Sequence, residues 1–339
     1  MIMSFALIKK ISFNSAFDFM ALRRLSLMFS GLLVLGSIAA FFTMGLNYGV
    51  DFRGGSLLEV RMKQAFQMDE LRSELNSLDL GEIRLQEFGL PTDVLILVQY
   101  QVAETAEEEE KAQQEAIERI KAQLDDRVDQ YRRTEVVGPT VSAELIEAGI
   151  LATLIALGAI ALYIAIRFEW RFALAALAAL THDVITTVGL FAILQLEFNL
   201  ATVAAILTIA GYSINDTVVV FDRIRESLRK YKQKTVYELL NMALNATLTR
   251  TTMTSITTLL ALLSLFIFGG PVIRDFSIAL IWGVIIGTYS SLLLATPLVL
   301  ILGLKATVFD KPEIDEEDGA AAYVKRMKSK RGDEDEEQG

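Results

Sequence analysis

The stretch LATVAAILTIAGYSINDTVVVFDRIRE, residues 200–226, is apolar over most of its length, yet it carries an aspartate, Asp216, inside the apolar run. About 20 mostly apolar residues are enough to cross the hydrocarbon core of a bilayer as a helix. An aspartate near the centre of such a helix costs roughly 2.5–3.5 kcal/mol. Asp216 lies about two turns inside the charged end of the stretch. We therefore predict a membrane-spanning helix with a functional carboxylate. The alternative is a polar packing seam, since small residues such as Gly211 commonly line helix interfaces.

The rest of the chain has the same block-like distribution of apolar residues. Hydrophobic residues make up 53% of the 339 residues and gather in blocks. The first block is longer than the ~7–15 apolar residues of a cleavable signal, so we predict an uncleaved anchor, although SIA within it is a weak cleavage site. Six blocks are long enough to span a membrane: residues 25–44, 147–166, 172–194, 200–221, 250–268 and 276–303. The predicted fold class is an α-helical integral membrane protein with six transmembrane helices.

Basic residues are distributed unevenly among the short loops between these spans. One set of loops is rich in them: Lys9, Lys10, Arg23, Arg24, Arg167, Arg171, Arg223, Arg225, Arg229, Lys230, Lys232 and Lys234. The short loops on the other side hold only Arg274. Because lysine and arginine favour cytoplasmic loops, we predict that both termini, residues 1–24 and 304–339, are cytoplasmic. The bundle of the second to sixth spans then covers 146–303, and the region 45–145 lies outside.

The outside region, residues 45–145, has the pattern of a folded domain. Alternating apolar stretches such as SLLEVRM (56–62) predict strands, and the charged stretch 104–128 predicts a helix that buries Ile117, Ile120 and Leu124. The order β-α-β-β-α-β is that of the α+β ferredoxin-like unit. The alternative is a solvated spacer, but three apolar strands need burial. The tail, residues 304–339, is acidic and lacks apolar periodicity, so we predict that it is disordered.

Other ionisable residues fall inside the predicted spans. Arg250 enters the fifth span from the same side as Asp216, so the two should lie at similar depth, where an ion pair would lower the pKa of the acid. The alternative is that the Arg250 side chain extends to the lipid headgroups on the cytoplasmic side. His182 and Asp183 lie near the middle of the third span, and a His/Asp pair there suits a proton relay. A structural hydrogen bond is the competing interpretation.

Composition and missing motifs exclude several classes of function. The chain has no cysteine and a single histidine, so thiolate catalysis and a metal site of several histidines are excluded. It has no phosphate-binding loop, nucleophile elbow or zinc-protease motif. The net charge of −10 comes without a basic stripe, which argues against nucleic-acid binding. We predict no enzyme activity, no cofactor and no metal, and expect charge movement across the membrane instead.

Four motifs, in order, carry a resemblance to a known family. They are NYGVDFRGG (47–55), VVGPTVSAEL (136–145), HDV (182–184) and SINDTVVVFDRIRE (213–226). They resemble the SecF family, subunits of the bacterial SecD–SecF protein-export complex, over nearly the whole chain except the acidic tail. The resemblance implies one six-helix half of a resistance–nodulation–division (RND) transporter, with SecD as the other half. It also implies a bacterial inner-membrane location with a periplasmic domain.

The resemblance also implies a function and a set of site residues. Members of the family are understood to pull unfolded preproteins as they emerge from the SecYEG channel and its associated translocon components. Proton flow is understood to drive this movement, which makes protons the coupling ion. Asp216 matches the essential acid of the fourth helix and Arg250 the arginine of the fifth. His182, Asp183 and Asn215 fall in the family's polar motifs. The loop motif with Asp51, Gly54 and Gly55 is expected to act as a hinge.

Two other functions stay open from the sequence. A small-molecule efflux transporter of the same superfamily would need a deep substrate pocket, for which an outside domain of about 100 residues is small. A structural scaffold would use the charges inside the membrane only for assembly with a partner. Membrane lipid is a partner in every case.

Overall fold

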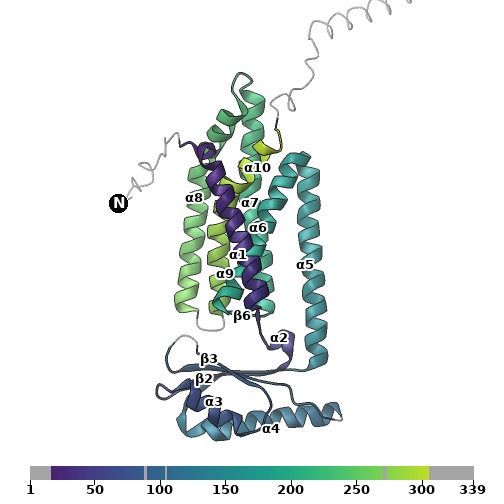
Figure 1. The fold of residues 1–339 in the computed structure, drawn as a ribbon, viewed down its shortest axis with the longest axis vertical. Coiled ribbons are helices and arrows are strands. Elements are labelled where there is room, and N and C mark those ends of the chain that lie inside the picture. Colours follow the sequence, from purple (N-terminus) through teal and green to yellow (C-terminus); the bar gives the residue numbers. More distant parts are fainter. Residues whose placement is uncertain (1–16, 88–89, 104, 270–272, 305–339) are drawn as a thin grey trace, which may run out of the picture.

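The computed structural model describes residues 17–87, 90–103, 105–269 and 273–304. In these ranges, six helices are long and apolar enough to cross a membrane. They form a bundle with a small α+β domain at one end, and α1 begins and α10 ends at the opposite end of the bundle (Figure 1). The spans are η2 (Phe19–Leu22) with α1 (Arg23–Met44), α5 (Pro139–Arg167), α6 (Trp170–Leu194), α7 (Leu200–Lys230), α8 (Val236–Phe268), and α9 (Arg274–Ser290) continued by the π-helical η5 (Ser291–Ala295) and by α10 (Thr296–Ile301). The predicted fold class is confirmed. The disordered tail predicted for residues 304–339 lies almost wholly outside the described residues.

Several helices extend beyond the predicted membrane segments. The helix α8 begins at Val236, well before the predicted span at 250, and α7 continues past 221 to Lys230. A capping box at the start of α8 explains its early beginning, since the side chains of Thr235 and Glu238 satisfy free backbone N–H groups there. Hydropathy marks only the part of a helix that lies in the membrane, whereas hydrogen bonding and caps set its true ends.

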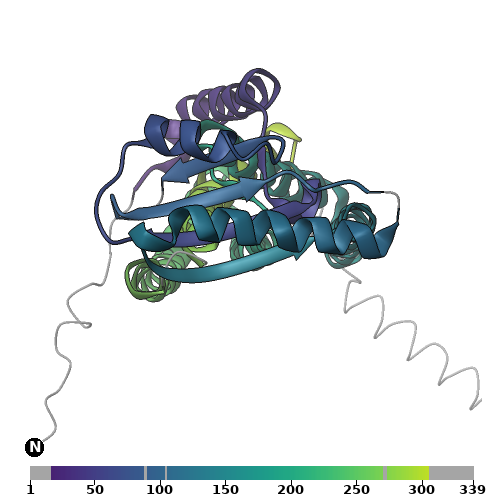
Figure 2. The ribbon, with the colours of Figure 1, turned by 90° about the horizontal axis from the view of Figure 1, so that it is seen from below.

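The domain has the predicted element order. It consists of β2 (Gly55–Met62), α3 (Met68–Asn76), β3 (Ile83–Glu87), β4 (Asp93–Val98), α4 (Ala106–Leu124), η3 (Asp125–Arg127) and β5 (Val128–Val137). The strands form an antiparallel sheet in the order β3-β4-β2-β5, which is consistent with a ferredoxin-like unit. The two helices cover the face of the sheet that is turned away from the bundle (Figures 1 and 2). Ile120 and Leu124 of α4 are fully buried against this face, and Ile117 is buried beside them, as predicted.

The opposite face of the sheet carries a group of charged side chains. Asp93 is 2% exposed, and Arg61 (2.8 Å) and Arg132 (3.2 Å) form ion pairs with it. Burial opposes ionisation of Asp93, but the hydrogen bond from Arg61 and the charges of both arginines outweigh burial and hold the pKa of this carboxyl below its usual value. The neighbouring Glu59 behaves in the opposite way: burial raises its pKa, although Arg132 and Arg133 counteract it. The strands β2, β4 and β5 are thus joined by buried charges as well as by their backbone ladder.

A short linker joins the domain to the bundle. Strand β1 (Asn47–Tyr48) pairs in parallel with β6 (Glu197–Phe198), which lies between α6 and α7. The helix α2 (Val50–Arg53) follows, and Asp51 accepts a hydrogen bond from the backbone N–H of Leu200 at the start of α7 (3.0 Å). The sequence did not indicate β1, β6 or α2, because elements of two to four residues have no periodicity to detect.

The glycine pair of the linker motif has a steric reason. Gly54 and Gly55 have φ angles of +72° and +117°, which side chains on L-residues disfavour. A Cβ on Gly55 would also overlap the carbonyl oxygen of Val98 on β4. The pair turns the chain from α2 directly into β2, so Gly55 is the first strand residue and not part of a loop.

Candidate functional site

The buried centre of the bundle is formed by α6, α7 and α9. About half or more of the apolar core of each is buried (50%, 50% and 61%), against 22%, 6% and 11% for α1, α5 and α8. Small residues allow the central helices to approach closely: a Cβ on Gly283 of α9 would overlap Ile209 of α7, and one on Gly287 would lie 3.2 Å from Ser213. This close packing brings polar side chains of three helices into contact.

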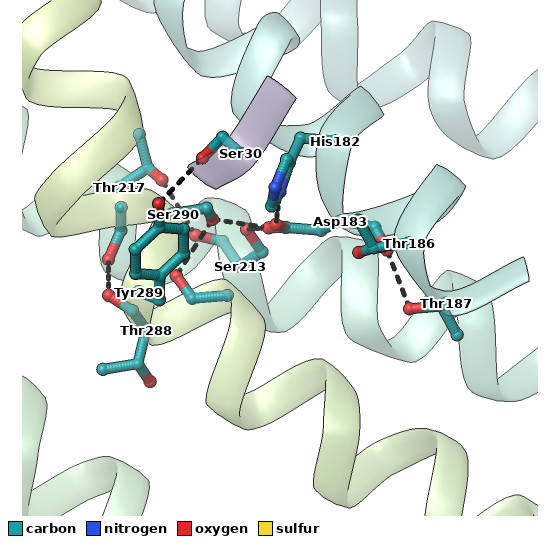
Figure 3. A network of polar contacts seen from close by, with 12 residues as sticks. Ser30, His182, Asp183, Thr186, Thr187, Ser213, Thr217, Thr288, Tyr289 and Ser290 are labelled. Carbon is teal, nitrogen blue, oxygen red and sulfur yellow. Dashed lines mark hydrogen bonds and ion pairs between the residues drawn. The ribbon is translucent and has the colours of Figure 1, made fainter. Parts of the chain in front are cut away.

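Asp183 of α6 is the hub of these polar contacts (Figure 3). Its side chain is fully buried, and one oxygen, Oδ2, accepts hydrogen bonds from Ser213 of α7 (2.5 Å) and Ser290 of α9 (2.7 Å). The other oxygen, Oδ1, lies 2.9 Å from Nδ1 of His182. His182 and Asp183 are therefore in contact, which is compatible with both the proton relay and the structural hydrogen bond considered from the sequence. The carboxyl group is held by three helices at once.

The network continues to the outer helices. Tyr289 of α9 lies beside the His182 ring, with ring centroids 6.2 Å apart, and its hydroxyl is 2.9 Å from that of Ser30 on α1. On the other side of α9, the hydroxyl of Thr288 lies 2.6 Å from the hydroxyl of Ser255 on α8. Hydrogen bonds between side chains thus connect α1, α8 and the three central helices at this level of the bundle (Figure 3).

A π-helical turn directly follows the serine that contacts Asp183. The turn η5 begins at Ser291, and the side-chain hydroxyl of Thr296 donates to the carbonyl of Ser291, five residues earlier (3.3 Å). Pro297 lacks the N–H that would continue the α-helical ladder, which explains a wider turn at this point. Such turns in α-helices often occur at functional sites.

His182 has one nitrogen that is not used within the network. Its ring is 3% exposed, and Nε2 is buried without a hydrogen-bond partner among the described residues. If Nδ1 carries the proton and donates to Asp183, a neutral ring presents the lone pair of Nε2.

Asp216 lies in a very different environment on α7. Its side chain is 4% exposed, and one oxygen, Oδ2, is buried without a hydrogen-bond partner in the described part of the chain. The neighbouring Thr217 hydroxyl donates to the backbone carbonyl of Ser213 (3.0 Å) and not to Asp216. Within the described ranges, no base is close enough to form an ion pair with this carboxyl.

The structure does not place Arg250 in contact with Asp216. The arginine side chain is exposed on the surface of α8 and acts on the aspartate only as a charge at longer range. Asp216 also has no hydrogen bond to the third-span pair, because Ser213, one turn earlier on α7, occupies the position next to Asp183. The pairing of Asp216 with Arg250 therefore stays a prediction for another state of the protein.

Asn215 points out of the bundle and not into the network. It is exposed on a face of α7 that also presents Thr208 and Gly211 at helical spacing. A Cβ on Gly211 would meet nothing within 4 Å, so no described helix of this chain packs on that face. The close approach predicted at Gly211 is not made inside the chain.

Sequence reasoning missed the residues that hold Asp183. Ser213 and Ser290 are fully or almost fully buried, but serine in a transmembrane helix is too common to indicate a partner. A recognisable signal was the glycine at 287, three residues before Ser290, since it allows α9 to approach Ser213. In the described residues, no group of three or more His, Cys, Asp or Glu side chains is arranged to hold a metal ion.

Comparison with known proteins identifies the family. Residues 116–305 match the model of the C-terminal part of the protein export membrane proteins SecD and SecF, and residues 39–65 match the SecD/SecF GG motif. The protein translocase subunit SecF of Rickettsia bellii is 44% identical over 295 residues, which cover 85% of this chain and 94% of that protein. SecF of Cereibacter sphaeroides is 46% identical over 284 residues, covering 81% and 86%.

Solved structures agree with these sequence matches. The crystal structure of SecDF from Thermus thermophilus, a translocon-associated membrane protein, is 35% identical, with a TM-score of 0.77. A SecDF structure in a super-membrane-facing form is 34% identical, with a TM-score of 0.59. The two matches cover 86% and 84% of this chain. They cover only 39% and 38% of the length of the two SecDF chains. The family model covers more than half of the chain and the relatives cover most of it; the chain belongs to the SecF family of membrane-embedded protein translocase subunits.

Proposed function

We propose that this chain is an accessory subunit of Sec protein translocation that is driven by the proton-motive force. The proposal rests on Asp216, a buried carboxyl inside a membrane span. Among the described residues, it has no counter-ion within ion-pairing distance, and one of its oxygens has no hydrogen-bond partner. An acid in such a place is costly when charged and is rare unless it has a function. Adding a proton removes the charge, and losing it restores the charge, so Asp216 can respond to proton flow without any cofactor or catalytic step.

Asp216 would load and release a proton, and the helices around it would move in response. In one state of the cycle, Arg250 would approach and neutralise the charged form. The linker then passes the movement on, because Asp51 binds the start of α7 and β1 pairs with β6. Gly54 and Gly55 are proposed as the hinge between this linker and the domain.

The two SecDF structures support a change of arrangement within the family, which we assign to the domain. They are nearly equally similar to this chain in sequence, at 35% and 34%, but their TM-scores differ, at 0.77 and 0.59. A difference of this kind is expected if the same parts are arranged differently in the two structures. The proposed role of the domain, on the periplasmic side, is to pull or release the unfolded preprotein that emerges from SecYEG.

SecD is proposed as the other half of the unit. The relatives in the SecDF structures carry more than twice the length of this chain, which leaves room for a second six-helix half. The exposed face of α7 with Thr208, Gly211 and Asn215 fits a partner helix, because small and polar residues favour helix packing in a membrane. The chain would lie in the inner membrane with both termini cytoplasmic, as the loop charges predict.

The proposal is tested with Asp216→Asn. Preprotein translocation is started with ATP in membrane vesicles that hold this chain, SecD and SecYEG; ATP is then removed and a proton gradient imposed. We expect Asp216→Asn to abolish the completion of translocation that depends on the gradient, because the amide cannot exchange a proton. Asp222→Asn is the matched control, since Asp222 lies on the same helix but pairs with Arg167 at the half-exposed helix end. Normal gradient-driven completion in Asp216→Asn would leave only a scaffold role.

A further inference from the structure

A groove opens at the domain end of the bundle, beside the linker and away from the polar network. Its volume is about 520 Å³. Gly149, Ile150 and Leu154 of α5 form one wall, and the rings of Phe52 and Phe198 form another, next to the start of α7. The groove therefore lies between two membrane helices and the segment that connects the bundle to the domain.

The groove crosses the boundary between membrane and water. The apolar run of α5 begins directly after Glu147, so Ile150 and Leu154 lie at the level of the hydrocarbon. Their side chains are 57% and 64% exposed and face outward from the chain. Tyr48 lines the linker end of the groove together with Phe52, and tyrosine is typical of membrane interfaces.

One cation lies at the linker end of the groove. Arg53, the last residue of α2, is exposed, and its guanidinium lies 5.9 Å from the centre of the Tyr48 ring. No carboxylate of the described residues lies within ion-pairing distance of it. Glu82 senses its charge but is itself paired with Arg84 at 2.6 Å. A guanidinium at this level is well suited to a phosphate, which it can bind with two parallel hydrogen bonds.

The chemistry of the lining distinguishes between occupants. Its one hydroxyl on α5, that of Thr153, already donates to the carbonyl of Gly149 (2.7 Å). An extended peptide in the groove would leave its own backbone groups without hydrogen-bond partners at this depth, which is strongly unfavourable in lipid. An acyl chain has no such groups. We propose that the groove binds one phospholipid of the leaflet on the domain side, with an acyl chain along α5 and the phosphate at Arg53.

The position of this site links the lipid to the linker. The phosphate would bind α2, directly before the glycine pair that leads into the domain, while the acyl chain packs on α5. A bound phospholipid would therefore hold the linker against the second span. This inference is independent of proton coupling at Asp216, because it concerns a different part of the bundle and is tested by lipid binding, not by export.

The test measures lipid that remains bound to the purified complex of the full chain with SecD, by native mass spectrometry after exchange into defined lipids. Gly149→Leu fills the groove, and its Cβ would meet only Leu200 at 3.8 Å, so the helix is expected to fold. Gly158→Leu is the matched control, since it lies on the same helix with nothing within 4 Å. We expect Gly149→Leu to lose the bound phosphatidylglycerol and Gly158→Leu to keep it.

A second arm tests the role of the phosphate. Arg53→Gln is expected to weaken binding of phosphatidylglycerol and phosphatidylethanolamine about tenfold, the size of one charge-assisted hydrogen bond. Binding of a phosphate-free glycolipid should not change. A photoreactive phenylalanine analogue at position 150 should label lipid. Retention of lipid by Gly149→Leu, an Arg53→Gln variant without effect, or labelling of SecD or of the preprotein at position 150 would each overturn the proposal.

Discussion

Two aspartates inside the membrane have opposite surroundings. Asp183 is held by His182, Ser213 and Ser290, while one oxygen of Asp216 has no hydrogen-bond partner in the part of the chain that the structure describes. A buried carboxyl that makes all its hydrogen bonds fixes one rigid local structure. A buried carboxyl without a counter-ion has no such partners, so its protonation state responds to nearby charges. At the scale of single residues, we therefore propose a positioning role for Asp183 and assign the proposed exchange of a proton to Asp216.

Stability measurements should separate these two roles. Asp183→Asn places an amide NH₂ where a carboxylate oxygen accepts hydrogen bonds, and we expect a loss of about 1–3 kcal/mol in the free energy of unfolding. Asp216→Asn removes only an unpaired acid, so it should not lower stability. Thermal unfolding of both variants in the same detergent checks this. An Asp183→Asn variant as stable as the parent would show that the network does not hold the bundle together.

Helix contacts depend on where the glycines lie. Gly287 faces Ser213 of α7, with an ideal Cβ at 3.2 Å, and Gly211 of α7 faces no described residue of this chain within 4 Å. The two glycines thus belong to different surfaces. One is inside the chain, and the other is on the face that we assign to SecD.

Leucine at each of these glycines should have a different effect. Gly287→Leu should separate α9 from α7 and lengthen the contacts to Asp183, which lowers the thermal stability of the chain itself. The overpacking cost is about 1–3 kcal/mol. Gly211→Leu should leave the stability of the isolated chain unchanged but reduce the amount of SecD that co-purifies in mild detergent. Undiminished recovery of SecD with Gly211→Leu would mean that this face of α7 is not the contact surface.

The sheet of the domain should be sensitive to acid. The pKa of Asp93 is held below the ordinary aspartate value of about 4. The stability that its ionised form contributes is therefore fully present above about pH 4 and is lost as the pH falls through the lowered pKa. Hydrogen exchange of β2 and β4 in the full chain, measured from pH 7 downward, should show faster opening below about pH 4. Asp93→Asn should open readily at all pH values and lose this dependence. If the Asp93→Asn variant still opened faster below about pH 4, another group would be responsible for the acid sensitivity.

At the scale of the whole molecule, few side-chain contacts attach the domain, apart from the direct passage of the chain from β5 into α5. Strand pairing joins β1 to β6, and Asn47 of β1 donates to Gln86 of β3 in the domain (3.0 Å). Glu197 of β6 lies near Arg133 of β5; burial raises the pKa of Glu197, and the arginine charge opposes this rise. Such small contacts are compatible with movement of the domain against the bundle.

Crosslinking this attachment tests whether movement is needed. The chain has no cysteine, so Asn47→Cys with Gln86→Cys provides two thiols and no others. Joining them with a short reducible bismaleimide-type reagent should stop gradient-driven completion of translocation, and reduction should restore it. Each single cysteine variant, treated in the same way, is the control. Full activity of the crosslinked protein would exclude rotation of the domain about this linker.

The sequence by itself determined the six spans, the element order of the domain and the membership of the family. These follow from hydropathy, periodicity and short motifs, which are properties of neighbouring residues. Only the tertiary structure decided that Asp183 meets Ser213 and Ser290, that Asn215 faces outward, and that Arg250 lies apart from Asp216. The physical reason is that a helix can turn about its axis without changing its hydropathy. Its rotation is fixed by close packing at glycines and by hydrogen bonds to other helices, which come from distant parts of the chain.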